Sequence, residues 1–87
     1  MSEPGGHISS AIVTARPEDV ATVATLIAKL PHTEVHARSA TRIVVVMEAA
    51  DSAALADRLT VIAALPRVLA AMMVFEQVLN DESIGAA

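Results

Sequence analysis

The sequence of 87 residues contains no cysteine, tryptophan or tyrosine, and Phe75 is its one phenylalanine. Without cysteine there is no disulfide framework, thiol nucleophile or thiolate metal ligand, so nothing implies an oxidising compartment. With one aromatic side chain, the protein lacks the stacking platform on which RNA-binding domains hold bases. A net charge of −4 also argues against binding a nucleic-acid backbone and favours a basic partner.

Aliphatic side chains dominate the composition. Hydrophobic residues make up 54% of the chain, which is too much for an intrinsically disordered protein, and the length suits a single domain. The first residues are polar and rich in Gly and Pro, and no apolar run approaches the length of a membrane span. We therefore expect a cytoplasmic protein with no membrane insertion. Its single domain should cover residues 7–79, between a disordered N-terminal segment (1–6) and a frayed tail (80–87).

The chain contains an internal repeat. Residues 7–38 align with residues 42–73 at an offset of 35, and eight positions are identical. Alanine pairs are expected by chance in a chain so rich in alanine. The shared Ile/Leu/Pro register, with Leu30-Pro31 over Leu65-Pro66, is harder to attribute to chance. The repeat predicts two halves with the same order of elements.

The first half reads as strand, helix, strand. Residues 8–15 are rich in β-branched and apolar side chains, which predicts a strand. Arg16-Pro17-Glu18-Asp19 begins a helix, because proline suits the first helical position and the carboxylates complement the helix dipole. Apolar residues then recur at helical spacing until Pro31 ends the helix. Residues 33–38 alternate in polarity and form a short second strand.

The second half repeats this order. Residues 42–49 form an apolar strand, Asp51 or Ser52 caps a helix, Pro66 ends that helix, and residues 68–78 form the last strand. Two such halves predict the α+β, ferredoxin-like βαββαβ fold. Right-handed crossovers would place both helices on one face of a four-stranded antiparallel sheet. Nothing in the chain is left to cover the other face, so we look for function there.

The polar residues form no pattern typical of catalysis or metal binding. His7, His32 and His36 lack metal-ligand spacing and are best explained as solvated side chains. Ser9 and Ser10 do not lie in a nucleophile elbow, and no two carboxylates form an obvious catalytic pair. We therefore expect no catalytic residue, no metal and no cofactor, and a protein that is not an enzyme.

The identity of the open face depends on register, since a slip of one residue reverses every assignment. One alternation joins Ser10, Ile12 and Thr14 with Val45 and Met47. The other joins Ser9, Ala11 and Val13 with Val44, Val46 and Glu48. Flexible methionines suit a surface that binds apolar helices, and an acid at its rim suits a basic ligand. We predict an open face of Ser10, Ile12, Val45, Met47, Ala70, Met72 and Val74, with Glu48 and Glu76 as its acids. Leu69, Met73 and Phe75 are assigned to the core.

Several short motifs over residues 7–77 resemble the NapD family in order and spacing. They are His7-Ile-Ser-Ser, Ala15-Arg-Pro-Glu, Glu34-Val-His-Ala, Ile43-Val-Val-Val with Glu48-Ala, Leu65-Pro, Val68-Leu and Val74-Phe. Three departures stand out. Pro31-His32 and Pro66-Arg67 replace the usual Pro-Gly after each helix, Thr41-Arg42 replaces Gly-Lys, and Val74-Phe-Glu replaces Val-Tyr-His. The turns after the helices are therefore expected to differ.

The resemblance implies a cytoplasmic chaperone for the periplasmic nitrate reductase. Proteins of this family bind the twin-arginine signal peptide of the catalytic subunit, NapA, and hold it from the Tat translocase until its cofactors are loaded. An acidic domain with an apolar face would complement such a peptide, which could order as a helix on binding. A monomer is expected, with a weak dimer left open. A regulatory module of ACT type is the alternative, although its usual Gly-rich loop is missing after the first strand.

Overall fold

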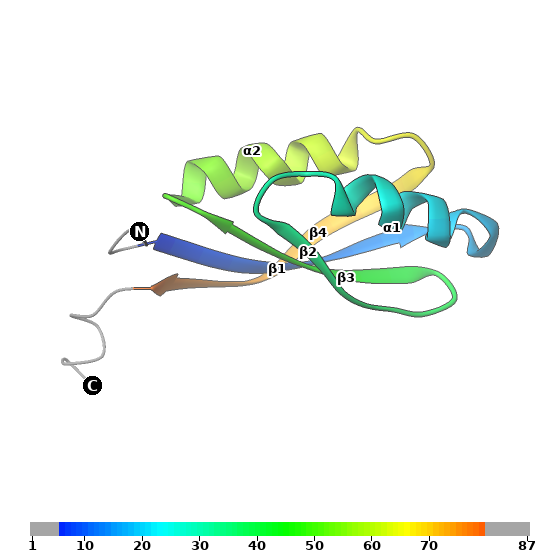
Figure 1. The fold of residues 1–87 in the computed structure, drawn as a ribbon, viewed down its shortest axis with the longest axis horizontal. Helices are drawn as coiled ribbons and strands as arrows, with labels where there is room; N and C mark the ends of the chain where they lie inside the picture. The colour runs from blue at the N-terminus through cyan, green and yellow to red at the C-terminus, as the bar shows by residue number, and fades with distance from the viewer. Residues whose placement is uncertain (1–5, 80–87) are drawn as a thin grey trace.

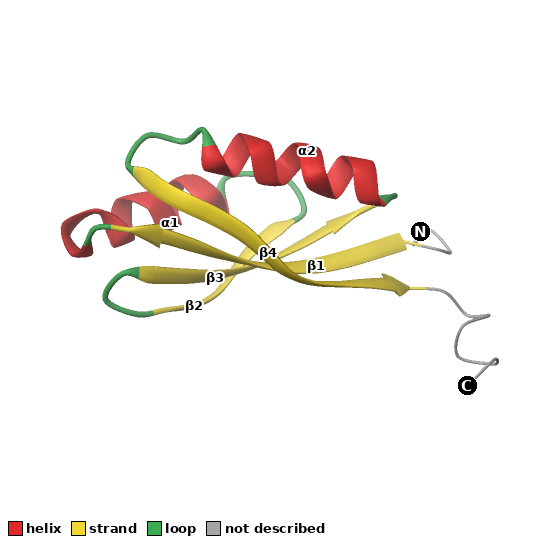
Figure 2. Cartoon of the chain, turned by 180° about the vertical axis from the view of Figure 1, so that it is seen from behind, coloured by secondary structure: helices red, strands yellow, loops and turns green. Residues whose placement is uncertain are grey.

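The computed structural model describes residues 6–79. In chain order the elements are β1 (Gly6–Ala15), a 3-10 helix (Pro17–Asp19), α1 (Val20–Ala28), β2 (Thr33–Arg38), β3 (Arg42–Ala49), α2 (Ser52–Ala63) and β4 (Val68–Leu79). The strands form one antiparallel sheet in the order β2-β3-β1-β4. Both helices lie on the same side of it (Figures 1 and 2). The predicted ferredoxin-like fold is confirmed. The expected disordered segment 1–6 and tail 80–87 lie outside the described residues, except that Gly6 opens β1.

Each helix packs on the sheet through the apolar stripe that its sequence predicts. Val20, Val23 and Ile27 of α1 are buried, and so are Leu55 and Ile62 of α2. The first turn of α2 is closed by a side-chain cap. Asp51 Oδ1 accepts a hydrogen bond of 2.8 Å from the backbone amide of Ala54, which satisfies one of the free donors at a helix N-terminus. Within residues 6–79, no helix has the length and apolarity needed to cross a membrane.

The core lies between the helices and one face of the sheet. β1 contributes Ala11, Val13 and Ala15, and β3 contributes Ile43, Val45 and Met47. Small side chains on β1 lie beside larger ones on β3, and the buried side chains form a core without an aromatic residue.

The turns after the two helices share a left-handed backbone. His32 has a φ of 53° and Arg67 has a φ of 73°, although neither is glycine. These two residues are also equivalent at the repeat offset of 35. A His and an Arg thus adopt left-handed geometry at the two positions where the family pattern usually has glycine, and the expected difference from the turns of other family members stays a prediction. A residue with a Cβ is held there at some energetic cost.

Both edge strands are interrupted by bulges. In β4 the register with β1 shifts between Ser10 and Ala11, and again between Thr14 and Ala15. In β2 the register with β3 shifts between Val35 and Ala37. Each bulge adds one residue to the edge strand and changes which side chains face the helices beyond it. Bulges also disfavour edge-to-edge pairing with other chains.

Candidate functional site

The candidate site is the face of the sheet that no described helix covers, here called the open face. Residues directly opposite each other in a sheet share a face, and the β1–β3 register pairs Ile8 with Glu48, Ser10 with Val46, and Ile12 with Val44. Their counterparts in β1 and β3 are buried under the helices, so these six side chains face the other way. The floor is therefore built from aliphatic side chains at the centre of the sheet.

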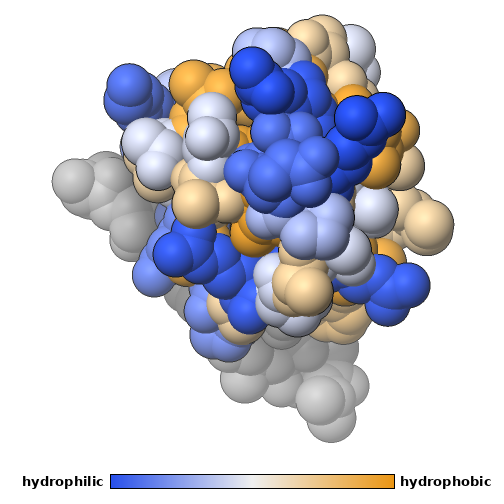
Figure 3. All heavy atoms as spheres, turned by 90° about the vertical axis from the view of Figure 1, so that its right-hand side faces the viewer, coloured by the Kyte–Doolittle hydropathy of each residue, from blue (hydrophilic) through white to orange (hydrophobic). Residues whose placement is uncertain are grey.

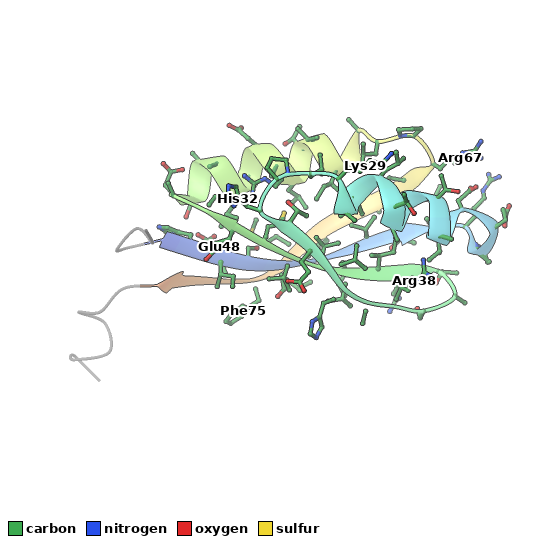
Figure 4. All side chains as sticks on the ribbon, viewed as in Figure 1. Lys29, His32, Arg38, Glu48, Arg67 and Phe75 are labelled. Carbon is green, nitrogen blue, oxygen red and sulfur yellow. The ribbon has the colours of Figure 1, made fainter. Side chains whose placement is uncertain are left out.

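β4 extends this floor with large exposed side chains. Met72 is paired with Ile12 and is 64% exposed. Phe75 is paired with Ser10 and is 54% exposed, on the side of the sheet away from the helices (Figure 4). Large apolar side chains exposed together in so small a domain indicate a surface that binds a partner.

Two predicted members of the open face lie on the opposite side. Val45 and Met47 are fully buried against the helices, so their assignment to the open face is wrong. The prediction matched Ser10 and Ile12 of β1 with the odd-numbered positions of β3. In the structure, the residues opposite Ser10 and Ile12 are the even-numbered Val46 and Val44. The structure places the other predicted members, Ser10, Ile12, Ala70, Met72 and Val74, together with Glu48, on or beside the open face.

Glu76 also lies outside the open face. It is paired with the buried Ser9, and its Oε2 atom lies 3.0 Å from Nδ1 of His7. The same oxygen accepts a hydrogen bond from the hydroxyl of Ser52 at the start of α2. These bonds, that from Ser52 above all, hold the pKa of the Glu76 carboxyl below its ordinary value. Glu76 thus joins β4 to β1 and α2 on the helix side.

A bulge in β4 explains why Phe75 is exposed and does not lie in the core as predicted. Val74 is the extra residue, so Val74 and Phe75 both lie opposite Ser10. Strict alternation from the partly buried Met73 would have sent Phe75 to the core, as predicted. The buried hydroxyl of Ser9 donates a hydrogen bond of 2.8 Å to the Phe75 carbonyl, which satisfies a group beside the bulge. Leu69, another residue assigned to the core, lies at the second bulge and is 60% exposed.

One end of the open face is acidic. Glu34 of β2 lies opposite Val46, and Glu48 is two residues further along β3, so the two carboxylates are diagonal neighbours about 7–8 Å apart at their Cα atoms. A shallow hollow of about 450 Å³ lies here, lined by Ile8, His32, Thr33, Glu34, Val46, Met47 and Glu48. Glu34 was not among the predicted site residues. Its diagonal relation to Glu48 depends on the register of β2, which the sequence does not reveal.

The acidic end is supported from the helix side. Nη1 of Arg58 in α2 donates a hydrogen bond of 2.7 Å to the backbone carbonyl of Glu48 and lies 3.4 Å from the carbonyl of His32. The backbone amide of Glu48 donates to the same His32 carbonyl at 3.0 Å. The guanidinium binds backbone carbonyls at this end, and the side chains of Glu34 and Glu48 are exposed.

Two polar side chains that the sequence singles out make structural hydrogen bonds in the described region. Ser9 is engaged with the Phe75 carbonyl, and His7 with Glu76. Among residues 6–79, no three histidine or carboxylate side chains are grouped so that they could hold a metal ion. The features of this face that a ligand would meet are its apolar surface and its charge.

Comparisons with known proteins agree with this architecture. The chain superimposes on the solution structure of the E. coli Tat proofreading chaperone protein NapD with a TM-score of 0.79 and 27% identity, over 87% of this chain and 82% of that one. It is 47% identical over 73 residues to a protein of Paracoccus pantotrophus named Chaperone NapD. That match covers 84% of this chain and 65% of the relative, so the chain spans slightly less than two thirds of the relative's length.

The family model for the NapD protein matches residues 6–80, which include every described helix and strand. The resemblance of the short motifs is therefore confirmed over almost the whole chain. The chain belongs to the NapD protein family.

Proposed function

We propose that this protein is a cytoplasmic chaperone that binds the twin-arginine signal peptide of the catalytic subunit of the periplasmic nitrate reductase. By occupying the signal, it would delay export until the cofactors of that subunit are loaded. The observation that carries the proposal is the open face, which is apolar at its centre and acidic at one end. The protein would act as a monomer and by binding alone, with no catalytic step of its own.

The chemistry of a twin-arginine signal fits both parts of this surface. Its paired arginines would lie near Glu34 and Glu48, and the apolar stretch that follows them would lie on the floor beyond. Met72 and Phe75 are large and exposed, and methionine adapts to irregular apolar ligands. The peptide would order as a helix, with part of its binding energy offsetting the loss of conformational entropy.

The residues proposed to contact the peptide differ from those predicted from sequence. Val45, Met47 and Glu76 are removed because they face the helices. The proposed contact set is Ile8, Ser10, Ile12, Glu34, Val44, Val46, Glu48, Ala70, Met72, Val74 and Phe75. The family match favours this chaperone over the alternative of an amino-acid-binding regulatory module.

Isothermal titration calorimetry tests the proposal. The probe is a synthetic peptide with the signal sequence of the nitrate reductase catalytic subunit from the same genome, and a second peptide has both arginines replaced by glutamine. We expect saturable binding of the first and weaker binding of the second. Absence of binding by the natural sequence would refute the proposal.

A matched pair of protein variants locates the site. Phe75→Ala should weaken the peptide about tenfold, because an anchoring aromatic contact is lost from the open face. Val61→Ala removes an apolar side chain of similar exposure, 48%, from α2 on the helix-covered side. It should leave the affinity unchanged. Equal effects of the two variants would exclude the open face as the binding surface.

A further inference from the structure

The open face carries opposite charges at its two ends. Glu48 lies opposite Ile8, near the end where residues 6–8 of β1 pair with residues 77–79 of β4, and Glu34 is level with Ser10, two residues closer to the centre. At the other end, Arg42 of β3 is exposed and lies opposite Thr14, a position on the open face. Figure 4 shows Glu48 and Arg38 at opposite ends of the sheet. The face is thus a strip with an acidic end, an apolar centre and a basic end.

The basic end is reinforced by its surroundings. Arg38 closes β2 and lies opposite the buried Ile43, so its exposed side chain is on the helix side of the sheet, and the exposed Arg16 follows β1 at the same end. Figure 3 looks onto this end of the molecule, where hydrophilic side chains gather. Arg67 lies nearby but is paired with Asp19 at 3.1 Å, and Glu18 belongs to the 3-10 helix that leads into α1. Arg42 is therefore the charge that the open face itself presents at this end.

The length of the strip matches a short helix. Glu48 and Arg42 are six residues apart on β3, which corresponds to about 20 Å along an extended strand. A helix covers about 20 Å with 13 or 14 residues. A helical ligand whose first turn lies beside Glu48 would therefore end near Arg42.

These charges distinguish the two directions in which a helix could lie. With its first turn at Glu34 and Glu48, the arginine pair of the ligand and the positive N-terminal end of its dipole meet carboxylates, and its negative C-terminal end meets Arg42. In the reverse direction the arginine pair meets Arg42, and the negative helix end meets the carboxylates. Each contact that is attractive in one direction becomes repulsive in the other.

Resting on the proposed function, we infer that the open face fixes the direction of its helical ligand. The signal peptide lies with its chain parallel to β1, its twin arginines at Glu34 and Glu48, and the end of its apolar segment at Arg42. The apolar centre attracts the helix equally in either direction. The charges at the two ends favour one of the two directions.

Paramagnetic labelling reads the direction directly. Because the protein has no cysteine, a nitroxide can be attached to a single cysteine at either end of the signal peptide and will label nothing else. In the bound complex, the N-terminal label should broaden the amide resonances of Ile8 and Glu48, and the C-terminal label those of Thr14 and Arg42. The reverse pattern, or equal broadening at both ends, would overturn the inferred direction while the proposed function stands. Failure of the peptide to bind would refute the proposed function itself.

A double-mutant cycle tests the charges. Glu48→Gln should weaken the natural peptide by about threefold, and this loss should disappear with the peptide whose arginines are glutamine. Asp57→Asn removes the same charge from an exposed position on α2 and should show no such coupling. Arg42→Gln should also show no coupling to the arginine pair. If Arg42→Gln instead strengthened binding through that pair, the peptide would lie in the opposite direction and the inference would be wrong.

Discussion

The buried hydroxyl of Ser9 donates a hydrogen bond of 2.8 Å to the backbone carbonyl of Phe75, across the pair of strands that carries the bulge. The bond links a core position of β1 to the residue that presents the one aromatic ring of the chain on the open face. Ser9 does not lie in a nucleophile elbow. Its place in the structure is to satisfy the backbone where β4 departs from regular pairing.

Replacing Ser9 by alanine should therefore lower the stability of the fold. The variant leaves a carbonyl beside the bulge without its partner, and we expect the free energy of unfolding to fall by about 1–3 kcal/mol. Urea denaturation followed by circular dichroism measures the change. Ser10→Ala, one residue along on the open face, should change stability by less than about 0.5 kcal/mol. Similar losses in both variants would contradict a specific role for the Ser9 hydroxyl.

Met47 and Met72 lie on opposite faces of the sheet, and their truncation should have opposite consequences. Met47→Ala removes a fully buried side chain and should cost about 2–4 kcal/mol of unfolding free energy. Met72→Ala removes an exposed side chain, so it should alter stability little and weaken binding of the signal peptide. Thermal unfolding and peptide titration of both variants check this. A larger loss of stability for Met72→Ala than for Met47→Ala would contradict the assignment of Met47 to the core and Met72 to the open face.

His32→Gly should stabilise the protein. At a φ of 53° the Cβ of histidine lowers the free energy of unfolding by about 1–2 kcal/mol. Glycine avoids this cost, but it loses more conformational entropy on folding. The free energy of unfolding should rise by about 0.5–1 kcal/mol in total. Glycine keeps the backbone carbonyl at position 32, so the hydrogen bond from the amide of Glu48 is not lost.

Arg67→Gly is the matched comparison for this change. It relieves the same backbone cost at a φ of 73° but removes the guanidinium that contacts Asp19 at 3.1 Å. The carboxylate of Asp19 would then lose its partner, and this is costly because the Asp19 side chain is mostly buried. The gain in unfolding free energy should therefore be small or become a loss. Denaturant midpoints of the two variants measure the difference. A destabilised His32→Gly protein would show that the imidazole has a stabilising contact beyond its backbone.

Glu76 should contribute a pH-dependent part of the stability. Hydrogen bonds from Ser52 and His7 lower the pKa of its carboxyl in the folded state. A lowered folded pKa means that the contribution is present above the ordinary pKa that the carboxyl has in the unfolded chain, and is lost as the pH falls through the folded pKa. Relative to Glu76→Gln, the natural protein should therefore be more stable near pH 6 and lose this advantage in acid.

Melting temperatures of the two proteins between pH 6 and pH 3 measure this difference. Ser52→Ala removes the main donor and should reduce the pH-dependent part without abolishing it, because His7 still contacts the carboxylate. Parallel melting curves for the natural protein and Glu76→Gln across the whole range would show that the cluster does not couple folding to pH.

Predictions about local structure succeeded because their signals are local. The strands at 33–38 and 42–49 have the predicted bounds, and Asp51 caps α2 as expected. In the helices the repeat offset of 35 relates two pairs of buried residues, since Val20 corresponds to Leu55 and Ile27 to Ile62. Helical periodicity and capping involve residues within one turn of each other, and such patterns can be read from sequence.

The same offset misleads in the strands. It places Ser10 over Val45 and Ile12 over Met47, whereas the structure buries Val45 and Met47 and leaves Ser10 and Ile12 on the open face. The buried positions of β1 and β3 correspond at an offset of 34, one less than in the helices, so one more residue separates equivalent strand and helix positions in the second half. A signal for the correct face was present. Arg42 and Glu48 are charged and share their parity with Val44 and Val46, which marks the even positions as the solvent side.

The sequence by itself determined the elements, their order, the two-layer architecture and the family, because each follows from local periodicity, turn residues or spaced motifs. Only the tertiary structure decided which residues form the open face, since that depends on pairing between strands far apart in the chain. A shift of one residue in register exchanges the two faces, and the bulge at Val74 turned Phe75 from an expected core residue into an exposed one. The closeness of Glu34 to Glu48, and with it the acidic end of the site, follows from the same long-range pairing.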